Sequence, residues 1–263
     1  MKRLAVLGHP VGHSRSPAMQ NAALAELGLA GEWTYGAIDL APDEFEHGVR
    51  EMLGEGFVGA NVTVPHKGAA LALADSLSET AREIGAANTL SFEAGEVRAD
   101  NTDAQGLLDA LPEPPGGKRV LVLGAGGAAR AVVWALVREG AEVAVWNRTA
   151  LRAEHLCVEL GGAPVETPDQ AASELIVNTS AAGLAGEDPF AELPLDPTRF
   201  SSGQIVVDLV YGERPSPLLA AAEAAGATTV DGIEVLVRQG ALSLRIWTGR
   251  EPSLEAMRAA ARR

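Results

Sequence analysis

The chain has 263 residues, of which 47% are hydrophobic and 21% charged, a composition typical of one or two globular domains. Its formal net charge of −14 argues against nucleic acid or an anionic membrane surface as a partner. A single cysteine excludes an internal disulfide and a cysteine-based zinc site, and no apolar run is long enough for a signal peptide or a membrane span. We therefore expect a cytoplasmic protein with no metal centre.

The first third of the chain alternates expected strands and helices, which is the pattern of an α/β fold. A short buried strand over 4–8 leads into a loop over 9–17 that is rich in hydroxyls, Gly and Pro. Ser16 suits the N-cap of the helix that Pro17 begins, or else Ser14 and Ser16 donate to a small polar ligand beside the first strand. The other elements expected here are strands over 32–39, 57–64 and 89–92 and helices over 43–54 (capped by Asp43), 69–84 (broken around 75–78) and 104–111.

Polar residues mark the end of the expected strand over 57–64. Asn61 and Thr63 face the same side of this strand by its period of two, and Lys67 follows just before an Ala- and Leu-rich helix. The chain has only three lysines, so a lysine kept at this place is informative. Lys67 is either a surface residue at a helix end or a group that converges with the polar pair on a ligand. Asp103 is either the N-cap of the next helix or the carboxylate partner of Lys67.

The segment over 111–117, Leu-Pro-Glu-Pro-Pro-Gly-Gly, is the clearest linker in the sequence. We expect it to separate an α/β substrate-binding catalytic domain, formed by 1–111 with 237–263, from a Rossmann-type, doubly wound dinucleotide-binding domain over 112–236. The last two helices would then return to the first domain. The elements expected beyond the linker are strands over 120–123, 142–146, 175–178, 205–208 and 228–231, and helices over 128–138, 150–160, 217–225, 233–246 and 253–263.

A glycine-rich turn joins the first strand and helix of the second expected domain. Gly124 permits the tight turn, and Gly126 lets the backbone approach a pyrophosphate with no Cβ in the way. The helix that starts near Gly127 directs free N–H groups at that anion, and Ala129 stands where the fingerprint has its third glycine. Because strand, turn, helix and strand occur together, the sequence predicts a dinucleotide site. The alternative is a glycine turn with no ligand.

The end of the second strand of this unit indicates which dinucleotide binds. An NAD enzyme carries Asp or Glu there, about 20 residues past the turn, to hold the ribose 2′-hydroxyl. This chain instead has Asn147, Arg148 and Thr149, with Arg152 one helical turn further on. Amide, hydroxyl and guanidinium groups suit a 2′-phosphate, so we predict NADP as the cofactor. The alternative is that the arginines are ordinary surface charges and Thr149 caps the next helix.

Seven motifs, spread from one end of the chain to the other, together give a specific signature. They are Ser14-Arg15-Ser16-Pro17, Asn-Val-Thr-Val-Pro-His-Lys at 61–67, Gly-Ala-Ala-Asn-Thr at 85–89, Asn101-Thr102-Asp103, Gly-Ala-Gly-Gly-Ala at 124–128, Asn147-Arg148-Thr149, and Asp231-Gly232 with Gln239. With these motifs the chain strongly resembles the shikimate dehydrogenase family. The resemblance implies reversible NADPH-linked reduction of 3-dehydroshikimate to shikimate, in aromatic amino-acid biosynthesis.

The resemblance also implies roles for individual residues. Lys67 and Asp103 would be the catalytic pair, and they would also touch the substrate. Residues implied to bind the substrate carboxylate are Ser14 and Ser16, with Tyr211 nearby, and those implied to bind ring hydroxyls are Asn61, Thr63, Asn88 and Gln239. Residues implied to bind the cofactor are Gly124, Ala125, Gly126, Gly127 and Ala128, then Asn147, Arg148, Thr149 and Arg152, and on the nicotinamide side Thr179, Ser180, Ala181, Leu209 and Gly232, with Glu79 as a weaker candidate.

Two departures from the family pattern concern local loop shape. Gln20 stands where the family often has His, and Tyr211-Gly212-Glu213 replaces the usual Tyr-Asn-Pro. Three alternatives remain open: a quinate/shikimate dehydrogenase of broader substrate and NAD use, an aminoshikimate-pathway relative, and a non-catalytic NADP-binding sensor of the same shape. An acid in place of Asn147 would favour the first, and a broken Lys67–Asp103 pair would favour the last. We expect a monomer or a homodimer.

Overall fold

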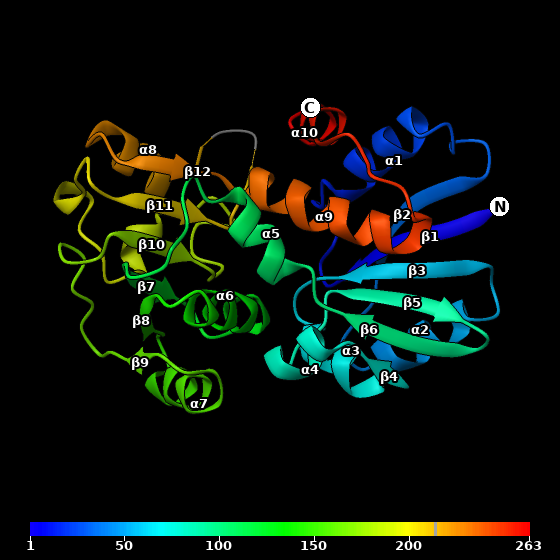
Figure 1. Cartoon of the computed structure of the whole chain (residues 1–263), viewed down its shortest axis with the longest axis horizontal. Coiled ribbons are helices and arrows are strands. Elements are labelled where there is room, and N and C mark those ends of the chain that lie inside the picture. Colours follow the sequence, from blue (N-terminus) through cyan, green and yellow to red (C-terminus); the bar gives the residue numbers. More distant parts are fainter. Residues whose placement is uncertain (213–214) are drawn as a thin grey trace. The chain divides into compact units, whose positions relative to one another are not determined.

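The computed structural model describes residues 1–212 and 215–263, so the expected loop change at Glu213 lies outside the described residues. The chain forms two compact units, one made of 1–106 with 236–263 and the other of 107–235. The division falls inside a helix, ahead of the proline-rich segment that we expected to be the linker. Each unit contains one six-stranded sheet with its own helices (Figure 1).

The sheet of the first unit has the order β2-β1-β3-β5-β6-β4. Strands β1, β2 and β3 are parallel, β5 and β6 form an antiparallel hairpin, and β4 pairs parallel with β6. The elements of this unit are β1 (Lys2–Gly8), α1 (Ser16–Glu26), β2 (Trp33–Asp39), α2 (Phe45–Met52), β3 (Phe57–Val62), α3 (Lys67–Leu73), β4 (Ser76–Leu77), α4 (Glu79–Ile84), β5 (Thr89–Glu93), β6 (Glu96–Asp100), the start of α5 (Asp103–Ala110), most of α9 (Gly232–Thr248) and α10 (Leu254–Ala261).

Helices cover both faces of this first sheet (Figure 1). One face packs on α2 and α3 through a buried cluster that includes Leu7, Phe45 and Leu90. On the other side α10 packs against α1. The buried amide of Gln20, the residue that departs from the family's histidine, donates to the Gly240 carbonyl oxygen at 2.9 Å and so ties α1 to α9. Residues 236–263 therefore belong to the first unit.

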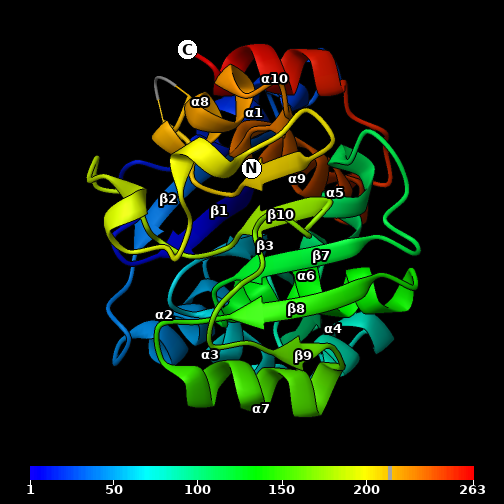
Figure 2. The ribbon, with the colours of Figure 1, turned by 90° about the vertical axis from the view of Figure 1, so that its left-hand side faces the viewer.

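The sheet of the second unit is entirely parallel, with the order β12-β11-β10-β7-β8-β9 (Figure 2). The chain winds from β7 through β8 to one edge and from β10 through β11 to the other, so the winding direction switches between β7 and β10. Its elements are the end of α5, β7 (Arg119–Leu123), α6 (Gly127–Arg138), β8 (Glu142–Trp146), α7 (Ala150–Leu160), β9 (Ala163–Pro164), β10 (Leu175–Asn178), two short 3₁₀ helices η1 (Pro189–Ala191) and η2 (Pro197–Arg199), β11 (Ile205–Asp208), α8 (Pro217–Ala224), β12 (Thr228–Val230) and the start of α9.

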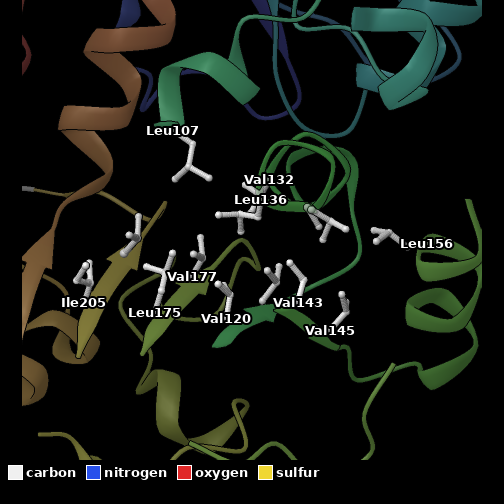
Figure 3. Close-up of a cluster of buried hydrophobic side chains, with 14 of the residues drawn as sticks. Leu107, Val120, Val132, Leu136, Val143, Val145, Leu156, Leu175, Val177 and Ile205 are labelled. Atoms are coloured by element: carbon white, nitrogen blue, oxygen red, sulfur yellow. The ribbon is translucent and has the colours of Figure 1, made fainter. Parts of the chain in front are cut away.

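The strands of this second sheet are buried on both faces, which explains their continuous apolar runs. Successive side chains of a strand point to opposite faces. Val120 and Val122 accordingly join the cluster under α6 and α7 that Figure 3 shows, whereas Leu121 and Leu123 join the cluster on the opposite face. Ala129 is fully buried in the first of these clusters, where a larger side chain would separate helix from sheet.

The structure decides four local expectations, of which the Asp43 cap and the end of the strand over 57–64 were wrong. Helix α2 starts at Phe45 with Glu44 before it, so Asp43 does not cap it. Ser16 is the first residue of α1 rather than its N-cap. The strand over 57–64 ends at Val62, because the chain turns at Thr63 to Pro65. The break expected at 75–78 is confirmed, since a short strand, β4, separates two distinct helices there.

None of the helices within residues 1–212 and 215–263 combines the length and the apolarity that crossing a bilayer requires.

Gly106 shows how closely α5 approaches α9 in the first unit. A Cβ at Gly106 would lie 2.7 Å from the Gln239 Cβ atom and 2.8 Å from its backbone nitrogen. We expect Gly106→Ala to lower the free energy of unfolding by about 1–3 kcal/mol, because backbone atoms cannot yield to the methyl group. The measurement is the urea unfolding midpoint.

Gly68 in α3 is the matched control, since a Cβ there meets no described atom within 4 Å. Gly68→Ala should leave the stability unchanged or raise it by up to about 1 kcal/mol. Equal effects of the two substitutions would contradict the close approach.

Candidate functional site

The first unit places Lys67 and Asp103 in direct contact. The Lys67 Nζ atom donates to Asp103 Oδ2 at 2.6 Å, and the two side chains are only 12% and 16% exposed. Lys67 is the first residue of α3 and Asp103 the first residue of α5, so two helix starts bring the pair together. An ammonium and a carboxylate at this distance, largely withdrawn from water, form a strong charge-assisted hydrogen bond.

The side chain of Asn101, rather than that of Asp103, accepts the backbone hydrogen bonds at the start of α5. The Asn101 Oδ1 atom accepts hydrogen bonds from the backbone nitrogens of Asp103 and Ala104, at 3.0 and 3.4 Å. Its own amide nitrogen donates to the Ala86 carbonyl oxygen at 2.9 Å, which fixes the buried side chain. Because Asn101 serves the start of α5, the Asp103 carboxylate is directed at Lys67 instead.

Asn88 holds the second oxygen of the Asp103 carboxylate. Its Nδ2 atom donates to Asp103 Oδ1 at 2.9 Å, and it also lies 3.0 Å from Gln239 Oε1 and 2.9 Å from Thr102 Oγ1. The Asn88 Oδ1 atom accepts from the Thr102 backbone nitrogen at 2.8 Å. Both carboxylate oxygens of Asp103 thus have donors, and the orientation of the carboxylate is set by a residue that is only 2% exposed.

A buried polar network continues behind Asn88. Ser243 Oγ lies 2.8 Å from Thr89 Oγ1 and accepts from Asn61 Nδ2 at 2.9 Å, while Tyr35 donates to Asn61 Oδ1 at 2.8 Å. Both ends of the Asn61 amide are therefore engaged within the protein. Sequence reasoning did not single out Ser243, although its position one turn after Gln239 on α9 places both on one helix face.

The other residues expected at the substrate are Ser14, Ser16, Thr63 and Tyr211. Ser14 Oγ accepts from the Ser16 backbone nitrogen at 3.2 Å, and Ser16 is 4% exposed. Thr63 is half-buried just past β3, where its backbone nitrogen donates to the Leu7 carbonyl oxygen. Tyr211 belongs to the second unit, shortly after β11. The structure thus joins Lys67, Asp103, Asn88 and Gln239 through their side chains, and the Asn61 amide donates to the Asn88 carbonyl oxygen at 3.2 Å.

The glycine turn of the second unit has the geometry of an anion site. Gly124 has a φ of +111°, and a Cβ there would lie 2.6 Å from Thr179 Oγ1, so only glycine fits. Gly126 precedes α6, and no described side chain caps the helix at that residue. A Cβ at Gly126 would meet no described atom within 4 Å, so the space beside the first N–H groups of α6 is open. These groups can receive a pyrophosphate.

The end of β8 carries the residues expected at the 2′-phosphate. Asn147 donates to the Thr149 carbonyl oxygen at 2.9 Å, and Arg148 and Arg152 are exposed. Thr149 occupies the N-cap position of α7, yet in the described chain its side chain makes no capping hydrogen bond, so capping does not account for it. The Arg148 Nη1 atom forms an ion pair with Glu192 Oε2 at 3.0 Å.

Two buried polar residues end the neighbouring strands β10 and β11, and sequence reasoning missed both. Asn178 donates to Asp208 Oδ1 at 2.9 Å, and each residue is 0% exposed. Asn178 Oδ1 accepts from the Ser180 hydroxyl at 2.7 Å, while Asp208 accepts from the Val210 backbone nitrogen at 3.0 Å and the Ser216 hydroxyl at 2.6 Å. The signal available in the sequence was a polar residue closing each of two apolar strands.

This pair of buried residues fixes the segments expected on the nicotinamide side. Thr179 donates from its hydroxyl to the Leu123 carbonyl oxygen at 2.8 Å, and Leu209 donates from its backbone nitrogen to the Asn178 carbonyl oxygen at 3.0 Å. A Cβ at Gly232 would lie 2.6 Å from the Leu209 carbonyl oxygen, so glycine is required where α9 begins. Ala181 is exposed. No cluster of metal-ligating side chains occurs in residues 1–212 and 215–263.

Three family models match the chain. The shikimate dehydrogenase substrate-binding domain matches residues 6–90, the shikimate/quinate 5-dehydrogenase model matches 111–180, and the shikimate 5′-dehydrogenase C-terminal domain matches 232–262. The first match contains the Lys67 and Asn88 positions, and the second contains the glycine turn.

Full-length relatives give the same result. The chain is 43% identical to shikimate dehydrogenase (NADP(+)) of Methanopyrus kandleri, over 97% of this chain and 93% of the relative, and 46% identical to that of Anaeromyxobacter sp. (strain Fw109-5), over 97% and 94%. It is also similar to the crystal structure of shikimate 5-dehydrogenase from Thermus thermophilus in complex with NADP(H) and shikimate, with 42% identity, a TM-score of 0.90, and coverage of 100% of this chain and 99% of that one.

One unit has a parallel sheet with a glycine turn, and the other carries a lysine–aspartate pair; these two features define a dinucleotide-dependent oxidoreductase. The chain belongs to the shikimate dehydrogenase family.

The pKa of the Asp208 carboxyl is raised above its ordinary value of 3.8 by burial, against which the hydrogen bonds from Ser216, Val210 and Asn178 act. Because the folded protein then holds the proton more tightly than the unfolded chain, Asp208 costs stability as pH rises from about 3.8 through its folded pKa. Asp208→Asn removes this cost. We expect the stability of the variant relative to wild type to rise as the pH is raised above about 3.8.

Urea unfolding of both proteins across this pH range is the measurement. The amide can still accept from Asn178 and Val210, which keeps most of the geometry. A stability difference that is constant, or that falls with pH, would contradict the raised pKa.

Proposed function

We propose that the protein catalyses the reversible NADPH-dependent reduction of 3-dehydroshikimate to shikimate, with Lys67 and Asp103 as the catalytic pair. The single observation that carries the residue assignment is the 2.6 Å contact between Lys67 Nζ and Asp103 Oδ2, which is largely shielded from water. Family membership and the NADP(+)-dependent relatives support the reaction and the cofactor.

The proposed chemistry depends on the negative charge that develops on the ketone oxygen of the substrate. Bound NADPH supplies the hydride to the ketone carbon, and the ketone oxygen becomes negatively charged. The Lys67 ammonium stabilises this oxygen and donates the proton that completes the hydroxyl group. In the reverse direction Lys67 accepts that proton. Asp103 keeps the ammonium in place through Oδ2, while Asn88 keeps Asp103 in place through Oδ1.

Substrate and cofactor are anions, and a chain with a formal net charge of −14 must bind them with local donors. We assign the substrate carboxylate to the hydroxyl groups of Ser14, Ser16 and Tyr211. The ring hydroxyls are assigned to Asn61, Thr63, Asn88 and Gln239, together with the catalytic pair.

The residues of the second unit fit NADP. The open N-terminus of α6, reached through Gly124, Ala125, Gly126, Gly127 and Ala128, would take the pyrophosphate. Asn147, Arg148, Thr149 and Arg152 would hold the 2′-phosphate. Thr179, Ser180, Ala181, Leu209 and Gly232 would line the nicotinamide.

An assay that follows nicotinamide absorbance tests the function, with shikimate plus NADP in one arm and quinate plus NAD in the other. Turnover in the second arm alone would overturn it.

Lys67→Met removes the ammonium while keeping a side chain of similar length. We expect kcat to fall by about 100-fold or more with a modest change in the KM for shikimate, because a proton donor acts mainly in the transition state. Lys118→Met is the matched control, since Lys118 forms a 2.8 Å ion pair with Glu113 at the opposite end of β7 from the glycine turn. Near-normal turnover of Lys67→Met would remove Lys67 from the mechanism.

Arg148→Ala tests the 2′-phosphate site. Loss of a charge-assisted contact should raise the KM for NADPH by about tenfold or more and leave the KM for NADH nearly unchanged, because NADH lacks the phosphate. Arg119→Ala is the control, since Arg119 is also exposed and ion-paired, with Glu174, but stands at the other end of the strands. Equal effects on the two cofactors would reject the assignment.

A further inference from the structure

The guanidinium assigned to the 2′-phosphate already binds a carboxylate of the same unit. Arg148 Nη1 lies 3.0 Å from Glu192 Oε2, with the Arg148 side chain 81% exposed and that of Glu192 41% exposed. The acid comes from a segment 44 residues further along the chain. A carboxylate and a phosphate compete for the same guanidinium N–H groups.

The backbone of Glu192 is held by buried structure on both sides. It directly follows η1, whose start is capped by Asp188, with the Phe190 backbone nitrogen donating to Asp188 Oδ1 at 3.0 Å. The next residue, Leu193, is 5% exposed within the cluster on the face of the sheet opposite α6. Phe190 packs against that cluster and lies edge-on to Phe200, with the ring centroids 6.4 Å apart.

The strand that precedes Arg148 packs against the same cluster. Trp146, the last residue of β8, lies two residues before Arg148 and packs against the cluster that contains Leu193. The Trp146 carbonyl oxygen accepts from the Gly124 backbone nitrogen at 2.8 Å, which fixes the end of β8 beside the glycine turn. Because one core cluster supports both partners, the fold itself sets the approach of Glu192 to Arg148.

We propose that Glu192 is a specificity-determining residue, which competes with the cofactor's 2′-phosphate for Arg148 and so lowers the preference for NADPH over NADH. The inference rests on the role of Arg148 in the proposed function. An exposed ion pair is weak, so a phosphate that carries more charge displaces the carboxylate, at a cost in affinity. NADH has no 2′-phosphate, so the ion pair between Arg148 and Glu192 does not affect its binding.

Glu192→Gln keeps the shape of the side chain and removes its charge. The dissociation constant of NADPH, measured by titrating nicotinamide fluorescence, should fall by about 2- to 5-fold, whereas that of NADH stays unchanged. The gain should shrink as salt is added, because exposed charges are screened. Glu174→Gln is the matched control, since Glu174 is also 41% exposed and ion-paired, with Arg119, and it should change neither constant.

The double variant Arg148→Ala/Glu192→Gln distinguishes a failure of the proposed competition by Glu192 from a failure of the role assigned to Arg148. If Glu192 acts through Arg148, the substitution Glu192→Gln has no effect on NADPH binding in the Arg148→Ala background. The same gain in both backgrounds would overturn the competition, as would unchanged NADPH binding in the single variant or an equal gain for NADH. If Arg148→Ala alone leaves NADPH binding intact, it is the assignment of Arg148 that fails.

Discussion

The first unit depends on one interaction, the ion pair between Lys67 and Asp103. Both side chains are mostly withdrawn from water, so each charge relies on the other, and removing one would leave the other uncompensated. The pair has only one arrangement because Asn88 takes the second oxygen of the Asp103 carboxylate. The network that reaches from Asn88 through Ser243 to Tyr35 therefore serves to aim a single ammonium group.

The second unit depends on a different constraint, which is how closely backbone segments approach at the carboxyl ends of parallel strands. A Cβ at Gly124 would clash with Thr179, and a Cβ at Gly232 would clash with Leu209. The segments that follow β7 and β10 therefore lie close together, as do those that follow β11 and β12. Asp208 and Asn178 hold two of these strand ends from inside the fold. The space left beside the start of α6 is open to an anion because the surrounding segments are fixed.

Much of this could be predicted from the sequence. Apolar runs predicted β8, β10, β11 and α7 at the bounds that the structure has, and the glycine turn indicated the dinucleotide unit. The N-cap residues of the first two helices were predicted less well. Asp43 and Ser16 have the residue types of N-caps but do not cap, because a cap depends on the backbone geometry of the preceding loop rather than on residue type alone.

Asn61, Asn88 and Gln239 were expected at the substrate, but the hydrogen bonds within the buried network were missed for a related reason. Hydrogen bonds from Asn88 to Gln239, or from Asn178 to Asp208, join residues from different elements, and no local pattern shows which polar side chains will meet. The ion pair between Arg148 and Glu192 is a contact of the same kind. Gly124, which acts through local geometry, could be found from its motif, and the contact of Lys67 with Asp103 was predicted as one of two alternatives. The other tertiary contacts were not predicted.

A crystal structure with shikimate bound is the measurement that tests the central claim most directly. The account predicts that the hydroxyl group to be oxidised lies within about 3.2 Å of Lys67 Nζ, with Asp103 still bound to that ammonium. A hydroxyl group more than about 4 Å from Lys67 Nζ, with another side chain in its place, would contradict it.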